Sequence, residues 1–397
     1  MMNKYKKSML VFIILHLCLF LTGCWGVTEL DELAMVAGLG VDLDEKTDEI
    51  ILTAQIIKAG EVGTSPGGGG KSGGPITGKK AAAVWVVESR GETFFDAVRA
   101  FTFQSSRKLY FPHAKIIVFG KSLAKKGIKP YLNLLIKDYE PRNNTLIAVA
   151  ENRASEVMEI TTELEKIPAY GLAKLIEIRT VTSQSSLVTV HEFIIGLLSK
   201  AKSPTASHIQ VIEKEGEKKA LVKGTAVFKD DKFIGTLNKT ETRGLLWMKN
   251  KVESGVVVIN DPQGKKVSIE IVDSSTEIKS KLADNRITIE ININDRGNIA
   301  ENMGELNLTT TRMISFLEKQ QNIIIKNEIE SALKKAYELN TDLMGFGDII
   351  YKYYPEIWKK IGAYQDHYWK EIDVKIKVDS KIQEVEMTTK PLTPEEK

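Results

Sequence analysis

The sequence predicts a mixed α/β to α+β protein with two to three α/β domains. In the first half, short apolar segments typical of strands alternate with segments of helical periodicity. In the second half, residues 287–294 alternate strictly between isoleucine and polar side chains, and residues 308–339 show helical spacing. The chain is also longer than one hydrophobic core normally serves. We therefore expect an N-terminal half of mixed β/α structure, and a C-terminal half that is mainly an antiparallel sheet covered by a long helix.

Residues 1–23 are predicted to be the signal peptide of an exported lipoprotein. Three lysines among the first seven residues precede an uncharged apolar run, Met9 to Leu21, which is the order of a secretory leader. That run is too short to span a bilayer comfortably. It leads into "LTGC" at residues 21–24, which resembles a bacterial lipobox. A plain signal peptide with a chance cysteine nearby is the alternative interpretation.

Cys24 is the predicted site of lipid attachment, as an S-diacylglycerol cysteine with or without an N-acyl chain such as palmitate. The other cysteine, Cys18, lies inside the leader, so the mature chain offers Cys24 no partner for a disulfide or a metal site. Two acyl chains hold a protein on a membrane stably, whereas one does so only marginally. We expect the folded body to be lipid-anchored to the outer face of the cytoplasmic membrane.

The charge balance offers no separate attraction to a polyanion. The chain has 55 basic and 52 acidic side chains, and three of the lysines belong to the leader, so the mature protein is formally neutral. Bulk charge therefore favours neither nucleic acid nor anionic lipid as a partner. No nucleic-acid partner is expected.

Two strands are predicted at the start of the mature chain, Leu33 to Asp42 and Glu49 to Lys58, joined by an acidic turn. An EF-hand loop would need glycine at its sixth position and glutamate at its twelfth, where this chain has Thr47 and Thr53. A solvated hairpin turn is the better interpretation of these residues.

Residues 60–80 hold nine of the 29 glycines and are predicted to form a flexible surface loop. The "GKS" at residues 70–72 suggests a phosphate-binding P-loop. That motif also needs a glycine five residues before Gly70, where Ser65 stands, and a helix afterwards, where a strand is predicted.

The segment from residue 81 to residue 203 is predicted to complete an α/β arrangement. The expected strands are 81–89, 113–120 and 144–152, and the expected helices are 92–106, 129–140 and a mainly helical region, 154–203, broken at Pro168. We place a domain boundary beside Pro204. The resulting divisions are an N-terminal region, 24–204, a C-terminal domain, 205–387, and a disordered tail, 388–397.

The C-terminal domain is predicted to contain a mostly antiparallel sheet with one solvated face. Its strands include residues 266–272, 287–294 and 372–380. The helix predicted to cover the other face has apolar residues at helical spacing: Leu317, Ile325, Ile329, Leu333 and Ala336. We interpret this apolar stripe as core rather than as a groove for a partner.

The sequence contains no specific catalytic, metal-binding or cofactor-binding motif. The histidines outside the leader lack the spacing of a zinc site, and no G-x-S-x-G nucleophile motif occurs. A pair of catalytic carboxylates is an alternative that the sequence leaves open, because its 52 aspartate and glutamate residues allow many combinations. His113, before a strand, could serve as a base, although a structural role is favoured. We expect a non-enzyme without a cofactor.

Four stretches spread over the mature chain resemble the Ger(x)C family, the lipoprotein C subunit of nutrient germinant receptors in endospore-forming bacteria. They are "CWGVTELDELAMVAGLGVD" at 24–42, "RKLYFPHAKIIVFGKSLAKKGIKPYLNLLIKDYEPRNN" at 107–144, "KGTAVFKDDKFIGTLNKTETRGLLWM" at 223–248 and "DLMGFGDIIYKYYPEIWKK" at 342–360. Their order and spacing carry the resemblance. Gly26 and Lys137 depart from the residues usual in the family, which are aspartate and arginine.

The resemblance implies three α/β domains and a diacylglyceryl cysteine at the outer surface of the spore inner membrane. It also implies two partners, a multi-pass A subunit and a transporter-like B subunit, with which this subunit is required for germination in response to nutrients. The family has no known enzymatic activity. Direct nutrient binding by this subunit is left open.

Two groups of residues within these stretches are candidates for contacts. The first could present polar groups at the entrance to a strand, although local capping and packing is favoured: Arg107, Tyr110 and His113. The second is a predicted turn and an aromatic-rich helix, which more often fills a core than forms an interface: Gly345, Phe346, Gly347, Trp358 and Trp369.

Two other function classes compete with a receptor subunit. A solute-binding lipoprotein of a transporter or sensor would have two similar doubly wound lobes around a cleft, which the antiparallel second half argues against. An exported cell-wall hydrolase with an unrecognised carboxylate pair is the least favoured.

Overall fold

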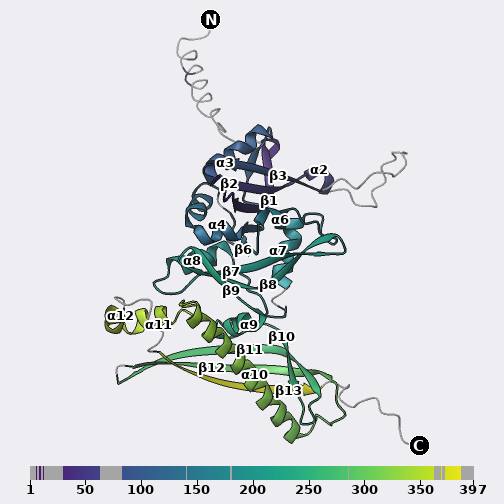
Figure 1. The fold of residues 1–397 in the computed structure, drawn as a ribbon, viewed down its shortest axis with the longest axis vertical. Coiled ribbons are helices and arrows are strands. Elements are labelled where there is room, and N and C mark those ends of the chain that lie inside the picture. The colour runs from purple at the N-terminus through teal and green to yellow at the C-terminus, as the bar shows by residue number, and fades with distance from the viewer. Residues whose placement is uncertain are drawn as a thin grey trace, which may run out of the picture.

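The computed structural model describes residues 30–62, 83–139, 141–178, 181–284, 286–361 and 372–385, together with Lys6, Met9, Phe12 and Tyr368. The predicted lipid site at Cys24, residues 63–80 of the glycine-rich segment, Trp369 and the tail 388–397 lie outside this set. The described residues form two sheets with helices packed against them (Figure 1). The predicted multi-domain α/β to α+β class is therefore confirmed.

The first sheet is mixed, with parallel strands in its centre and antiparallel pairs on both sides. In the described part of the chain it has nine strands in the order β3 (Val84–Gly91), β2 (Ile50–Ile57), β1 (Leu33–Leu43), β5 (Ile116–Phe119), β6 (Leu146–Ala150), β7 (Thr205–Lys214), β8 (Glu217–Lys229) and β9 (Lys232–Leu237), with β4 (Lys108–Tyr110) paired to β1. The pairs β1–β5, β5–β6 and β6–β7 are parallel. β1 and β2 form the predicted hairpin across the acidic turn.

Helices cover both faces of this sheet. One core contains side chains of α3 (Phe94–Ala100), α4 (Lys121–Lys126), α5 (Lys129–Leu134) and α8 (Val190–Leu198), and the other contains side chains of α6 (Ala154–Met158) and α7 (Pro168–Ile178). Along β5, Ile117 and Phe119 face the first core while Ile116 and Val118 face the second. A strand buried on both faces reads as a continuous apolar run, which is how this segment appears in the sequence.

The remaining short elements of the first half are η1 (Leu30–Glu32), α2 (Ala59–Val62), η2 (Phe101–Phe103) and η3 (Leu135–Tyr139). The helix predicted over residues 92–106 is shorter than expected. Thr93 caps α3 by accepting the backbone N–H of Asp96, and the chain tightens into η2 after Ala100. Pro168 begins α7, where its missing N–H costs no helical hydrogen bond.

The first sheet continues beyond Pro204. β7 pairs in parallel with β6, and β8 and β9 then extend the same sheet. The predicted boundary between residues 204 and 205 therefore falls within the run of sequence that builds this sheet. The division of the chain at that point stays a prediction.

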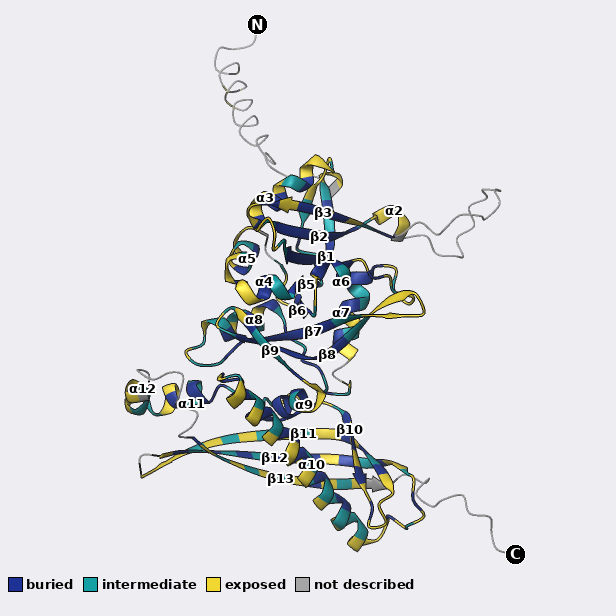
Figure 2. Cartoon of the chain, viewed as in Figure 1, coloured by how far each residue is buried: buried dark blue, intermediate teal, exposed yellow. Residues whose placement is uncertain are grey.

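The second sheet has the order β10 (Gly255–Asn260), β11 (Lys266–Ala283), β12 (Arg286–Asn302) and β13 (Asp373–Val385) among the described residues. The pairs β10–β11 and β11–β12 are antiparallel, whereas β13 runs parallel to β12. Ile287, Ile289, Ile291 and Ile293 are all buried. Figure 2 shows buried positions recurring along these strands between more exposed ones. The predicted, mainly antiparallel sheet with one solvated face is confirmed.

α10 (Thr311–Glu338) lies across this sheet and is the predicted covering helix (Figure 1). The apolar residues that predicted it are all buried: Leu317, Ile325, Ile329, Leu333 and Ala336. α9 (Lys239–Met248) lies between the two sheets and packs against α10, and α11 (Phe346–Tyr353) and α12 (Pro355–Ile361) follow. No described helix is both long enough and apolar enough to cross a membrane.

Candidate functional site at the junction of the two sheets

Two segments far apart in the sequence meet where the two sheets join. Lys202 and Asp342 form an isolated parallel bridge, and the backbone N–H of Ser203 donates to the carbonyl of Asp342 at 2.7 Å. The hydroxyl of Thr341 also hydrogen-bonds to the hydroxyl of Ser203. The residues after α8 are thereby joined to the residues before α11.

Asp342 is the centre of this junction and is 2% exposed. Its carboxylate accepts the backbone N–H of Phe346 at 3.1 Å and of Gly347 at 2.7 Å, and the hydroxyl of Tyr368 at 2.8 Å. Burial raises the pKa of Asp342 to about 6, although these hydrogen bonds oppose the change. A carboxylate at this position caps the first turn of α11 and complements its dipole. Asp342 therefore fixes the position of the first turn of α11 relative to the junction.

The two glycines of "GFG" allow this close approach. Gly345 has φ of +82°, a left-handed conformation that glycine adopts without strain. A Cβ on Gly347 would overlap the Cβ of Ala201 in the opposite segment. A turn before a helix is confirmed, but it ends at Gly345, because Phe346 and Gly347 already belong to the first turn of α11.

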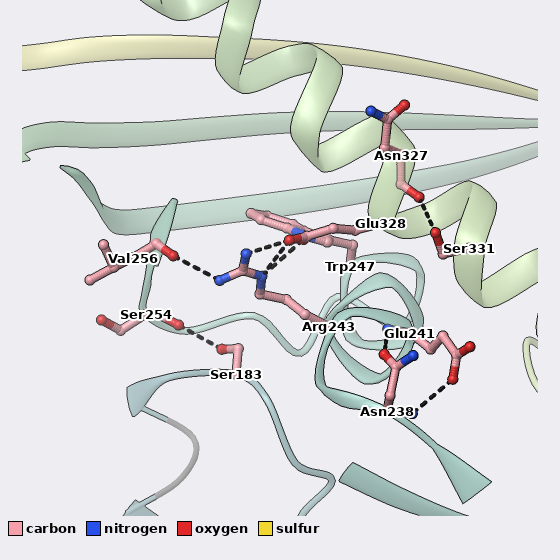
Figure 3. Close-up of polar contacts among 10 residues, drawn as sticks. All are labelled: Ser183, Asn238, Glu241, Arg243, Trp247, Ser254, Val256, Asn327, Glu328 and Ser331. Carbon is pink, nitrogen blue, oxygen red and sulfur yellow. Dashed lines mark hydrogen bonds and ion pairs between the residues drawn. The ribbon is translucent and has the colours of Figure 1, made fainter. Parts of the chain in front are cut away.

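A buried ion pair holds α9 against α10 (Figure 3). Arg243 and Glu328 are 8% and 4% exposed, and the guanidinium Nε donates to Glu328 Oε2 at 2.9 Å. Trp247 Nε1 donates to the same oxygen at 3.0 Å, and Arg243 Nη1 donates to the carbonyl of Val256 in β10 at 2.9 Å. One carboxylate thus ties two helices together, and its arginine partner reaches the edge of the second sheet.

The start of α9 and the start of β10 are also fixed by hydrogen bonds. At the start of α9, Asn238 accepts the backbone N–H of Glu241 at 2.9 Å, and Glu241 accepts that of Asn238 at 2.7 Å, which is a capping box (Figure 3). Ser183 donates to the carbonyl of Ser254 at 2.6 Å and so links the first half of the chain to the start of β10.

A cavity of about 430 Å³ lies beside the C-terminal end of α9. Three lysines line it, Lys202, Lys249 and Lys251, together with Glu192. Lys251 pairs with Glu192 at 2.6 Å. Burial lowers the pKa of Lys249 to about 7, and the positive charges of Lys202 and Lys251 lower it further. The cavity walls therefore carry more positive than negative charge.

The first two stretches of the resemblance also meet in space. Asp42 at the end of β1 accepts the backbone N–H of Ala154 at 2.7 Å and of Ser155 at 2.8 Å, so it caps α6. A Cβ on Gly120 would overlap the Asp42 carboxylate. Burial raises the pKa of Asp42, while the two backbone N–H donors lower it.

The candidate residues of the second stretch form a local contact. The rings of Tyr110 and His113 lie 5.8 Å apart between centroids. Arg107 donates its backbone N–H to Ser105 Oγ at 3.0 Å. These contacts agree with local capping and packing.

The aromatic residues after "GFG" contribute to the second core. Trp358 in α12 is partly buried against that core and lies edge-on to Tyr368, with 6.1 Å between ring centroids. Sequence reasoning missed the larger set that builds the junction: Lys202, Arg243, Lys249, Glu328 and Asp342. Of these residues, only Asp342 has a local signal in the sequence, because an aspartate shortly before Gly345 and Gly347 is typical of a residue that caps a helix.

Within the described residues, no group of three or more histidine, cysteine, aspartate or glutamate side chains is arranged to hold a metal ion. The buried His208 lies 3.1 Å from Glu151, through Nε2, and 3.1 Å from the carbonyl of Lys223, through Nδ1. Burial lowers the pKa of His208, although both neighbours oppose the change. These contacts assign His208 to the packing of β7 against β8.

Comparisons with known proteins give a consistent result. Residues 26–211 match the family model "Spore germination protein N-terminal domain", and residues 223–386 match "Spore germination B3/ GerAC like, C-terminal". Spore germination protein KC of Bacillus subtilis (strain 168) is 26% identical over 408 residues, covering 98% of each chain. Spore germination protein B3 of the same organism is 24% identical and covers 95% of this chain and 96% of its own.

One solved structure has the same fold. The chain titled "Crystal Structure of the GerBC protein" superposes with a TM-score of 0.55 at 20% sequence identity, covering 87% of this chain and 97% of that one. The two family models together span both sheets and the junction between them, in the order that the four sequence stretches predicted. The chain therefore belongs to the Ger(x)C family of spore germination proteins.

Proposed function

We propose that this protein is the membrane-anchored lipoprotein subunit of a spore nutrient germinant receptor. It is required together with membrane-embedded A and B subunits for nutrient-triggered germination, and it acts by binding proteins rather than by catalysis. The observation that carries this proposal is the pair of spore-germination family matches, residues 26–211 and 223–386, the first of which begins two residues after Cys24.

The lipid on Cys24 supplies the membrane affinity in this proposal. The mature chain is formally neutral, so bulk charge provides no attraction to anionic lipid. Two acyl chains on one N-terminal cysteine would hold the body at the outer face of the spore inner membrane. The A and B subunits then meet it at that surface.

The shape of the body favours a receptor subunit over a solute-binding lipoprotein. A solute-binding protein has two similar lobes around a ligand cleft. Here the described residues form a large mixed sheet and a smaller four-stranded sheet of different topology. The cell-wall hydrolase alternative predicts lysis zones in zymography with the purified protein, and such zones would refute the proposed non-enzymatic role.

Two cysteine variants test the anchor. Cys24→Ala should abolish incorporation of labelled palmitate, release the protein from spore membranes and impair nutrient-triggered germination. Cys18→Ala is the matched control, because this second cysteine lies within the predicted leader, and it should leave all three properties unchanged. A soluble Cys24→Ala protein that still supports full germination would refute the tether.

A pull-down tests the partners. The wild-type protein, purified from detergent-solubilised spore membranes, should bring down two multi-pass membrane proteins. Recovery of the protein without any membrane partner, from membranes in which it is abundant, would refute the receptor assignment.

A further inference from the structure

The cavity beside Lys249 has the features of a binding site for a small anion. We propose that it binds a small organic carboxylate, with the carboxylate group held by Lys202 and Lys249 and the apolar part of the molecule packed against the cavity wall. This inference goes beyond the proposed function and does not depend on it.

The charges lining the cavity are unbalanced. Among the described residues that line the cavity, Glu192 is the only acidic one. Its carboxylate already pairs with Lys251 at 2.6 Å and accepts the backbone N–H of Thr189 at 3.1 Å. Among the described residues, neither Lys202 nor Lys249 has an acidic side chain within ion-pair distance. Two lysine side chains of the cavity wall therefore have no ion-pair partner of their own, and a bound carboxylate would supply one.

The other lining residues select the kind of anion. Alongside the charged residues, the wall includes five apolar residues and three with hydroxyl groups: Leu187, Val188, Ile195, Leu246 and Met344, and Ser186, Ser203 and Thr205. Such a wall favours a molecule with an apolar part over a fully hydrated anion such as phosphate. The volume of about 430 Å³ lies in the range of small-molecule sites.

Both halves of the chain contribute to the cavity. Glu192 belongs to α8 and Lys202 follows that helix, whereas Lys249 follows α9 and Met344 precedes α11. The stem of Lys202 passes the "GFG" turn, with its Cδ 3.4 Å from the position of a Cβ on Gly345. A ligand held between Lys202 and Lys249 would therefore connect the segments that join the two sheets.

The binding should depend on the protonation of Lys249. Without ligand the pKa of Lys249 is about 7, because burial and the nearby Lys202 and Lys251 disfavour its charged form, while Glu192 and Asp342 oppose this change. A bound carboxylate favours the charged form and raises that pKa. The affinity should therefore be constant from the pH at which the carboxyl group of the ligand is fully ionised up to about pH 7, and fall up to about tenfold per pH unit above it.

The test uses the full-length protein in detergent and isovalerate as the probe. Isovalerate should raise the melting temperature in a saturable way, whereas the uncharged analogue isoamyl alcohol and chloride at equal ionic strength should not. Lys249→Met and Lys202→Met should each weaken binding by about tenfold or more. Lys239→Met is the matched control, because it removes the same charge from the exposed start of α9 and should bind like wild type.

Several results would overturn the proposal. A shift that is equal for isovalerate and chloride would identify a general salt effect, and a stronger saturable shift with phosphate would overturn the carboxylate assignment. Equal isovalerate binding by wild type, Lys249→Met and Lys202→Met, each verified as folded by circular dichroism, would show that the two lysines do not hold the carboxylate and would refute the proposal. Affinity for isovalerate that does not fall above about pH 7 would exclude Lys249 from the site.

Discussion

The ion pair between Arg243 and Glu328 offers a sharp test of how the second half of the chain is held together (Figure 3). Glu328→Met should destabilise the protein by about 3–5 kcal/mol, since it leaves a buried guanidinium without its counter-charge. The Val256 carbonyl would be the remaining acceptor among the described hydrogen bonds of Arg243, and Trp247 Nε1 would lose its partner. In calorimetry, the temperature of the unfolding transition that includes the second sheet should fall by roughly 6–20 °C.

A double variant separates the charge from the packing. Arg243→Met/Glu328→Met should cost less than Glu328→Met alone, because no charge is then left buried. Glu330→Met is the matched control on the exposed side of α10, where Glu330 pairs with Lys326 at 3.7 Å, and it should change stability by less than about 0.5 kcal/mol. If Glu328→Met were as mild as Glu330→Met, or if the double variant were the least stable, the reasoning would be wrong.

Two further predictions concern the junction and the first sheet. Gly347→Ala should lower the free energy of unfolding by about 1–3 kcal/mol in calorimetry, because the new Cβ overlaps Ala201. Gly60→Ala is the control and should be close to neutral, because its Cβ meets no atom within 4 Å; equal stabilities of the two variants would show that the junction adjusts to the added Cβ without cost. Burial lowers the pKa of His208 below its ordinary value of 6.5, so the folded state binds fewer protons than the unfolded state. The stability that the protein has above pH 6.5 is therefore lost as the pH falls toward and through the pKa of the folded state. Wild type should therefore lose more stability than His208→Gln between about pH 7.5 and pH 5, and parallel unfolding curves would contradict this assignment.

The elements that the sequence predicted best are those whose periodicity directly reflects burial. The alternation at residues 287–294 and the apolar stripe of residues 308–339 each place one face in a core, and β12 and α10 follow them closely. The buried strand β5 was recognisable for the same reason, as a short apolar run.

The parts that escaped prediction depend on contacts between distant residues. Arg243 and Glu328 are 85 positions apart, and neither has a local pattern that indicates a buried charge. The lysines of the cavity come together only when α8 and α9 are placed on either side of it. The parallel pairing of β7 with β6 and of β13 with β12 also has no signature in the strands themselves, because alternation reports which face is buried and not which neighbour is adjacent.

The continuation of the first sheet past Pro204 has a practical consequence for dissecting the protein. A fragment truncated at that residue would lack β7, which hydrogen-bonds to β6 at Ala148–Ala150. The apolar strand β6 would then become an unprotected sheet margin, with free backbone groups that recruit other chains. An N-terminal fragment should instead retain residues through Leu237, so that the hairpin formed by β8 and β9 completes the sheet as it does in the intact molecule.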